Sequence, residues 1–377
     1  MRIKLALCAV AVLSACGGGG GTPAGGGPAA SAPSAATPAP PVSQSLVVFP
    51  GTQPAGGAGA TGVKFSHLGG IAADRAGNVY VTDACAIRKV TPAGAVTTLV
   101  GGGACDPAFP GGTVNDGGQA ATFLNFGTIT VDASGNVYVA DINMVRKATP
   151  AGTLVPLAGR TLSTPATGPS VDGAGDAASF EYIHDIAAGP DGNVLVADET
   201  YYPREGTGPS AVPACKVVDG YESLRTVTPQ GVVTTLPGTS ANCDESRRGP
   251  LTGARMIRYD ASGNLYLVHP AGIVRHGSAG DATIVPAAAY RNGSPIAIAP
   301  DDAGNLYYLT TIDAGVYYTI VKVAPDGTQT DVLSTRRDAP ADIRTTDLVY
   351  GIRNLAWVGN HDFVFNADDV LMRVTLK

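Results

Sequence analysis

Residues 126–159 read FGTITVDASGNVYVADINMVRKATPAGTLVPLAG, and this stretch decides the fold. Runs rich in Val, Ile, Thr and Tyr are separated by turns that contain Gly, Asn or Pro, a pattern typical of short antiparallel strands. We predict strands over 127–131, 136–140, 144–148 and 154–157. One four-stranded unit cannot bury both of its faces, so this unit must stack against others.

Copies of this unit recur along the chain. Each is marked by Gly-Asn before a strand-like run, and successive copies are 58, 57, 71, 41 and 55 residues apart. Repeats of this length indicate a propeller or a solenoid. Gly and Asn both tolerate the positive φ that tight hairpins require. The pairs are Gly77-Asn78, Gly135-Asn136, Gly192-Asn193, Gly263-Asn264, Gly304-Asn305 and Gly359-Asn360.

The two ends of the repeat region complement each other. The sixth copy has only three strand-like runs, RNLAWV, HDFVF and VLMRVTL, whereas SLVVFPG at 45–51 resembles the fourth strands of other copies. We infer that 46–49 pairs with 370–376 and closes a ring, which leaves only short sheet edges. The predicted fold is all-β: a six-bladed β-propeller of four-stranded antiparallel blades, closed by an N-terminal strand that pairs with the C-terminal blade.

The repeated phrase also resembles a known family. G-I-A-x-D-x-x-G-N-x-Y-V-x-D…I-R-K-V-T-P-x-G-x-V-T-T-L-x-G is similar to the NHL repeat, most closely in the first three copies, and the resemblance covers most of 69–377. NHL repeats form six-bladed propellers, so the resemblance implies the same blade count. Phe65, Phe123 and Phe180 each precede a first strand, and we expect them to pack between neighbouring blades.

The N-terminal segment predicts export. Residues 1–15 carry Arg2, Lys4 and an apolar run too short to span a bilayer. Leu-Ser-Ala-Cys-Gly at 13–17 resembles the bacterial lipoprotein signal, which implies a lipid on Cys16 and, with Gly17 after it, an outer-membrane address. An ordinary secretory signal is the alternative. Residues 16–44 are almost wholly Gly, Ala, Pro, Ser and Thr and predict a flexible tether before a propeller at 45–377.

Charge excludes some partners. Without Arg2 and Lys4 the chain has 23 basic and 31 acidic residues, which argues against nucleic acid and against adsorption to anionic lipid. We expect a monomer held at the membrane by its lipid alone.

Four cysteines remain after Cys8 and Cys16 and allow three pairings. Equivalent repeat positions favour Cys85–Cys105 and Cys215–Cys243 as disulfides, over a four-cysteine zinc site that lacks Cys-x-x-Cys spacing.

Two sets of carboxylates recur. The first set begins Asp-x-x-Gly-Asn turns, where we expect turn caps rather than calcium loops, because the further acidic ligands are missing. The second set ends second strands. It predicts either an acidic mouth for a ligand or pairs with nearby arginines. The turn residues are Asp74, Asp132, Asp260 and Asp301; the strand-end residues are Asp83, Asp141 and Asp198, near Arg88, Arg146 and Arg225.

Three histidines are candidate ligands. His67 and His184 precede first strands, and His269 ends a second strand. Related propeller lyases and lactonases place such ligands around the channel mouth, so three histidines from different blades suggest a zinc site with an open position. However, His67 and His184 do not occupy matching repeat positions. The sequence contains neither a Gly-x-Ser-x-Gly elbow nor a phosphate-binding glycine loop.

An insertion in copy three, 199–222, reads ETYYPREGTGPSAVPACKVVDGYE. Long insertions in propellers fall in loops, and loops on rigid scaffolds carry function. Tyr201, Tyr202 and Tyr221 make it a candidate recognition loop; a decoration without a ligand is the alternative. The sequence favours an envelope binding module for a protein, peptide or glycan, without cofactor or catalytic residues. The alternative is a metal-dependent lyase or lactonase-type hydrolase at the channel mouth.

Overall fold

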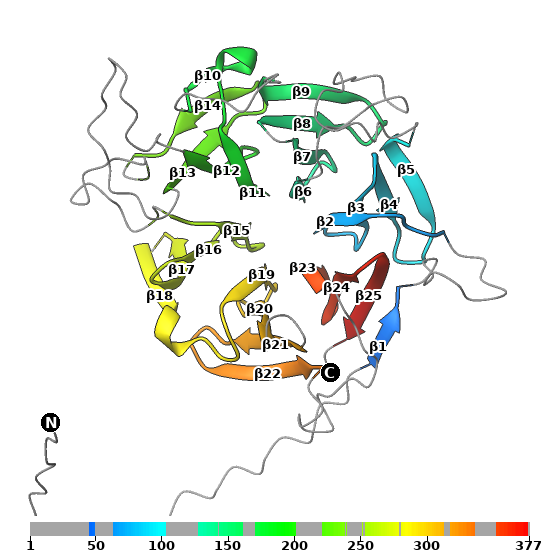
Figure 1. The fold of residues 1–377 in the computed structure, drawn as a ribbon, viewed down its shortest axis with the longest axis vertical. Helices are drawn as coiled ribbons and strands as arrows, with labels where there is room; N and C mark the ends of the chain where they lie inside the picture. Colours follow the sequence, from blue (N-terminus) through cyan, green and yellow to red (C-terminus); the bar gives the residue numbers. More distant parts are fainter. Residues whose placement is uncertain are drawn as a thin grey trace, which may run out of the picture. The chain divides into compact units, whose positions relative to one another are not determined.

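Six antiparallel sheets surround a common centre as the blades of a propeller (Figure 1). The computed structural model describes residues 45–49, 63–102, 127–141, 143–160, 170–200, 221–237, 239, 251, 253–278, 280–312, 317–335 and 352–375. Five of the six sheets have four strands, so the prediction of an all-β six-bladed propeller is confirmed at this level. No helix within these ranges has the length and hydrophobicity that a membrane span needs.

The first three blades follow the repeat copies. Blade one contains β2 (Leu68–Ala73), β3 (Val79–Asp83), β4 (Ala86–Val90) and β5 (Val96–Gly101). Blade two contains β6 (Ile129–Val131), β7 (Val137–Asp141), β8 (Met144–Ala148) and β9 (Leu154–Gly159). Blade three contains β11 (Tyr182–Ala188), β12 (Val194–Thr200), β13 (Tyr221–Val227) and β14 (Val232–Thr235).

The other three blades keep the same order. Blade four contains β15 (Met256–Tyr259), β16 (Leu265–His269), β17 (Gly272–Gly277) and β18 (Gly280–Pro286). Blade five contains β19 (Pro295–Pro300), β20 (Leu306–Ile312), β21 (Tyr317–Val323) and β22 (Gln329–Ser334). Blade six contains β23 (Ile352–Gly359), β24 (Asp362–Ala367) and β25 (Val370–Thr375), with β1 (Ser45–Val48) beside β25 and Leu46 opposite Val374.

Blade three differs from the four-stranded prediction. A two-residue strand, β10 (Gly173–Ala174), adds a fifth strand at its outer edge, where Gly173 lies opposite Val233. Asp172 holds this segment in place, since its carboxylate accepts hydrogen bonds from the Thr235 N–H and hydroxyl, both at 2.9 Å. The expectation of four strands was therefore wrong for this blade, because a linker side chain ties the incoming chain to the edge.

The Gly-Asn turns owe their shape to the preceding aspartate. Asp74 Oδ1 accepts the N–H groups of Ala76 at 3.0 Å and Asn78 at 2.9 Å, and Oδ2 accepts the Asn78 side-chain amide at 2.8 Å. Gly77 has a φ of 78°, which favours glycine. The same caps form at Asp132, Asp260 and Asp301. The prediction that these carboxylates are turn caps is confirmed.

The core lies between the blades. There are six hydrophobic clusters within the described residues, and each combines side chains from two neighbouring blades. Phe65 is buried between blades six and one, and Phe180 between blades two and three, as predicted; Phe123 lies outside the described residues. Burial of such faces supplies most of the stabilisation of a repeat fold.

Candidate functional site

The ring has two ends with different connections. Each second strand runs from a Gly-Asn turn at one end to the connection with its third strand at the other. We call the end with the Gly-Asn turns the turn face, and the opposite end the hairpin face. Asp74 therefore lies at the turn face, and Asp83, the last residue of β3, lies at the hairpin face.

Asp–Arg pairs occupy the hairpin face of the first three blades. Arg88 Nε lies 3.3 Å from Asp83, Arg146 Nη1 lies 3.0 Å from Asp141, and Arg225 Nη1 lies 2.9 Å from Asp198. In the second and third pairs both side chains are buried, at 1% exposure or less. The interpretation of these carboxylates as partners of the nearby arginines is confirmed. They join strands within a blade and do not offer free charge to a ligand.

The pairs of blades one and three also anchor the chain that enters the blade. Asp83 Oδ1 accepts the N–H groups of Ser66 at 2.7 Å and His67 at 3.2 Å, just before β2. In blade three, Arg225 donates to the Ser179 carbonyl at 2.6 Å and to Asp172 at 2.9 Å. Partial burial acts to raise the pKa of Asp172, but hydrogen bonds from Thr235 and Arg225 outweigh it, so this pKa lies below its usual value.

The three candidate histidines are not brought together as ligands. His67 is exposed, and its carbonyl accepts the Ala84 N–H at 3.0 Å. His184 lies at a bulge in β11, with Nε2 2.5 Å from Glu199 Oε2 and its ring 4.9 Å from that of Tyr182. His269 Nδ1 accepts the Ala271 N–H at 3.0 Å. Within the described ranges, no group of three or more His, Cys, Asp and Glu side chains is placed to hold a metal.

The pair between His184 and Glu199 was not foreseen. The register of β11 and β12 shifts between Ile183 and Asp185, and such a shift leaves no mark in the sequence periodicity.

Of the predicted cysteines, Cys85 is disulfide-bonded, and its partner lies outside the described residues. Cys16, Cys105, Cys215 and Cys243 also lie outside them, so lipidation and both pairings stay predictions.

The blade-three hairpin is longer than the equivalent hairpins of blades one, two and four. β12 and β13 continue past Asp198 opposite Ser223 with two further pairs, Glu199 opposite Glu222 and Thr200 opposite Tyr221. In blade one the ladder stops where Asp83 lies opposite Ala86. The backbone of Tyr221 thus belongs to this ladder, whereas Tyr201 and Tyr202 lie outside the described residues. Blade five is extended similarly, to Ile312 opposite Tyr317.

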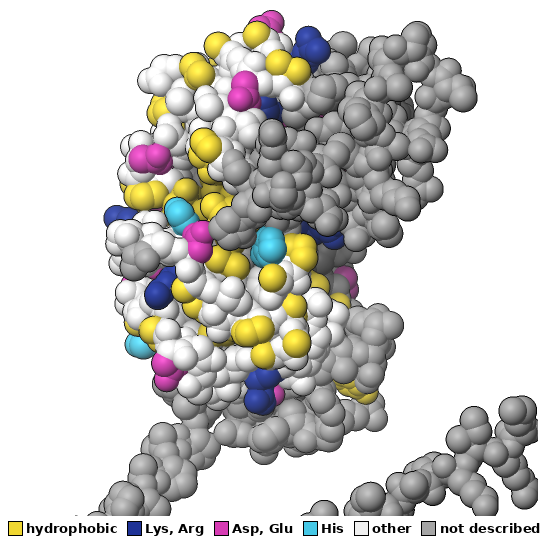
Figure 2. Space-filling view, turned by 90° about the vertical axis from the view of Figure 1, so that its left-hand side faces the viewer, with side chains coloured by type: hydrophobic (Ala, Val, Ile, Leu, Met, Phe, Trp, Pro, Cys, Tyr) yellow, Lys and Arg dark blue, Asp and Glu magenta, His cyan; other side chains and the backbone are white. Residues whose placement is uncertain are grey.

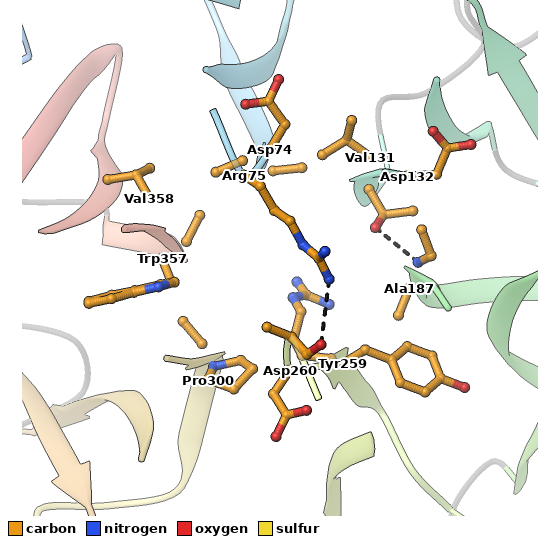
Figure 3. A pocket seen from close by; sticks show the side chains of 18 of the residues that line it. Asp74, Arg75, Val131, Asp132, Ala187, Tyr259, Asp260, Pro300, Trp357 and Val358 are labelled. Atoms are coloured by element: carbon orange, nitrogen blue, oxygen red, sulfur yellow. Dashed lines mark hydrogen bonds between the residues drawn. The ribbon is translucent and has the colours of Figure 1, made fainter. Parts of the chain in front are cut away.

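A central cavity of about 700 Å³ opens at the turn face, and first strands of all six blades line it (Figure 3). Arg75 points across this cavity, and its Nη2 donates to the Ala261 carbonyl at 3.5 Å. Deeper in the wall, Arg258 Nη1 donates to Asp185 at 2.5 Å. Trp357 Nε1 donates to Asp302 at 3.1 Å. Sequence reasoning missed this cavity, because Arg75 and Arg258 each occur once, at repeat positions where other blades have different residues such as Ala261 and Ala72.

Figure 2 shows the outer edge of the ring from one side. Hydrophobic, basic and acidic side chains are interspersed over the described surface there. Such mixing is ordinary for a protein surface and marks no interaction site by itself.

Comparison with known proteins supports the assignment of the fold. Neither a protein-family model nor a curated protein matches the chain. The chain is similar to the solved structure of XC5397 from Xanthomonas campestris, described as a gluconolactonase, with a TM-score of 0.52 and 13% identity over 89% of this chain and 90% of that one. A Bacteroides thetaiotaomicron protein of unknown function gives a TM-score of 0.53 and 13% identity, over 89% and 76% of the two chains. At these identities the likeness shows the fold alone, a six-bladed propeller.

Proposed function

We propose that this protein is an exported, lipid-anchored propeller of the cell envelope, and that it binds a protein, peptide or glycan through the insertion of blade three. The extended ladder of β12 and β13 carries this proposal. It pairs Thr200 with Tyr221 at the base of the insertion. Recognition loops work best when a rigid element holds both of their ends, because less conformational entropy is lost on binding.

Side chains beneath the ladder support the same conclusion. The pair between His184 and Glu199 joins β11 to β12 at the level of the extra residue pairs, and Tyr182 packs edge-on against the imidazole. These contacts stiffen the base of the hairpin on the side of the channel. The adjacent tyrosines Tyr201 and Tyr202 follow directly and supply the aromatic anchors that binding interfaces favour.

The hairpin face is better suited to binding than to metal-dependent hydrolysis. The carboxylates Asp83, Asp141 and Asp198 are engaged with arginines and entering backbone. His184 is engaged with Glu199, and His269 with its own turn. A hydrolytic metal centre needs several converging ligands and an open position. In these side chains, the oxygen and nitrogen atoms that could bind a metal form contacts within the blades instead.

Direct crosslinking tests the binding proposal. A photo-reactive amino acid in place of Tyr202 should crosslink a partner in envelope extracts. Replacing residues 201–220 by Asn-Gly should abolish capture of the partner. The same replacement of residues 313–316, in the long hairpin of blade five, should preserve capture. Unchanged melting temperatures would show that both variants fold. If capture persists without 201–220, the insertion is not the recognition element.

The membrane anchor has its own test. Residues 13–17 support the proposal that Cys16 receives the lipid. Cys16→Ser should move the protein from the outer-membrane fraction, which dissolves only with detergent, to the fraction that is soluble without detergent. If Cys16→Ser stays with the membrane, the anchor is elsewhere.

We also propose that β1 closes the ring. Support comes from the antiparallel register between Ser45–Val48 and β25, and from Phe49, whose N–H donates to the Leu371 carbonyl at 2.8 Å. The Phe49 side chain is 1% exposed within the cluster between blades six and one. A strand that joins the first and last blades in this way leaves no open radial edge.

A further inference from the structure

Alanines of four first strands line the central cavity at the turn face, beside larger side chains such as Ile129, Tyr259 and Trp357. Alanines stand at its wall on blades one, three, five and six, and the channel between them remains open. They include Ala72, Ala187, Ala299 and Ala356. A volume of about 700 Å³ lies within the range of pockets that hold small molecules. The first strands that line the cavity are edge strands of their sheets, so backbone N–H and C=O groups as well as a few longer side chains face a ligand there.

Arg75 is the side chain that crosses the cavity. It leaves the Gly-Asn turn of blade one and reaches Ala261 on blade four, the opposite blade of the ring (Figures 1 and 3). The contact of 3.5 Å is at the outer limit of a hydrogen bond. Arg75 is exposed, and no carboxylate within the described residues pairs with it. Its guanidinium therefore presents one positive charge and several unused N–H donors to the cavity.

Arg258 adds donors without adding net charge. Its Nη1 is held by Asp185, and Asp185 also accepts the Thr128 hydroxyl at 2.6 Å and the Ile257 N–H at 2.9 Å. This network spans blades two, three and four and fixes the guanidinium against the wall. Nε and Nη2 of Arg258 have no partner within the described part of the chain, and the side chain is 25% exposed.

Asp74, Asp132, Asp260 and Asp302 line the cavity together with two arginines, but none of these carboxylates forms an ion pair with Arg75. The carboxyl groups of Asp74, Asp132 and Asp260 point away from the centre into their own turns (Figure 3), where N–H groups occupy their oxygens. Asp302 is exposed at the rim and accepts the Trp357 N–H, and solvent screens its charge. Arg258 is matched by Asp185. Among the described residues of this cavity, Arg75 is thus the arginine without a carboxylate partner, and its guanidinium can pair with an anionic ligand.

We propose that this cavity binds a small organic monocarboxylate. The ligand carboxylate accepts hydrogen bonds from Arg75, which gives up its weak contact with Ala261. It also accepts hydrogen bonds from Nε and Nη2 of Arg258. Guanidinium and carboxylate are both planar and form strong paired hydrogen bonds, especially where walls of low dielectric exclude water. The rest of the ligand lies against the alanine wall and beside Trp357. This site is at the turn face and is independent of the insertion at the hairpin face.

The chain carries its own reporter for this site, because Trp357 is its single tryptophan. Fluorescence of the full-length protein would be titrated with acetate, hexanoate and benzoate, with benzamide as the neutral match of benzoate and inorganic phosphate as an anion of another shape. We expect a saturable change with hexanoate and benzoate, and none with benzamide. Equal responses to benzoate and benzamide, a response to phosphate alone, or no saturable response to any monocarboxylate would overturn the proposal.

Variants locate the site. Arg75→Gln should weaken benzoate binding at least tenfold, as roughly expected for the loss of a charged hydrogen-bonding partner, and Arg75→Lys should recover part of that affinity. Arg160→Gln, which removes an exposed arginine outside the cavity, should bind as the wild type does. Because Arg75 is exposed on a turn, its variants should keep the wild-type melting temperature. Wild-type affinity in Arg75→Gln would contradict the proposal.

Discussion

Arg225 donates from Nη1 to Asp198 at 2.9 Å, and both side chains are almost wholly buried. The same guanidinium lies 4.7 Å from the centre of the Phe180 ring. One side chain of β13 thus joins its own hairpin to the linker that enters the blade. The equivalent pair in blade one, Arg88 with Asp83, has the same chemistry, but the Arg88 side chain is 27% exposed. Because the two Asp–Arg pairs have the same chemistry but the arginines differ in exposure, a comparison of the pairs measures how much burial contributes to stability.

Removing the arginine should therefore cost different amounts in the two blades. Arg225→Met leaves Asp198 buried without its counter-charge, so we expect the free energy of unfolding to fall by about 3–5 kcal/mol. Arg88→Met should cost less, about 1–2 kcal/mol, because water reaches the Arg88 side chain, although Asp83 is buried. Denaturant unfolding of both variants measures the difference. Equal losses in the two variants would contradict the role assigned to burial.

The proposal that β1 closes the ring can be tested on Val47 in this strand and on Phe49, which follows it. Phe49 is 1% exposed between blades six and one, whereas Val47 is 46% exposed two residues earlier. Phe49→Ala should lower the free energy of unfolding by about 3–5 kcal/mol, the usual cost of emptying a buried phenylalanine site. Val47→Ala should change it by less than about 0.5 kcal/mol. If Phe49→Ala is as stable as Val47→Ala, β1 does not hold the ring.

Sequence patterns predicted the parts of this protein that repeat. Strand runs around Gly135-Asn136, the turn cap of Asp132 and the pair of Asp141 with Arg146 all follow from residues that recur at fixed offsets. Features that occur once were not predicted. The β10 strand depends on Asp172, and the pair of His184 with Glu199 depends on a bulge. Arg75 crosses to the opposite blade, a contact between residues 186 positions apart, which no local pattern records.

Alkaline pH should destabilise the fold through its buried tyrosines. Burial raises the pKa of Tyr80, and together with the nearby Asp74 carboxylate, which accepts a hydrogen bond from the phenol at 3.1 Å, brings it to about 12. Burial also raises the pKa of Tyr290 and of Tyr308 to about 12. An unfolded tyrosine ionises near pH 10, so the stabilisation is complete below pH 10 and is lost as the pH rises towards 12.

Melting temperatures measured at successive pH values should thus fall between pH 10 and 12. Tyr80→Phe should show a shallower fall over this interval, because one of the ionising groups is gone. At neutral pH the same variant should lose about 1 kcal/mol with its hydrogen bond to Asp74. A fall in Tyr80→Phe as steep as in the wild type would mean that this phenol does not contribute.

The central claim is that the polar side chains of the hairpin face are used inside the blades and that the protein binds without a catalytic metal. Elemental analysis of the purified protein tests it most directly. We predict a substoichiometric metal content that is the same in the wild type, in His184→Ala and in Arg160→Gln. One equivalent of a divalent metal that is lost in His184→Ala, and retained in Arg160→Gln, would contradict the claim and favour the metal-dependent hydrolase.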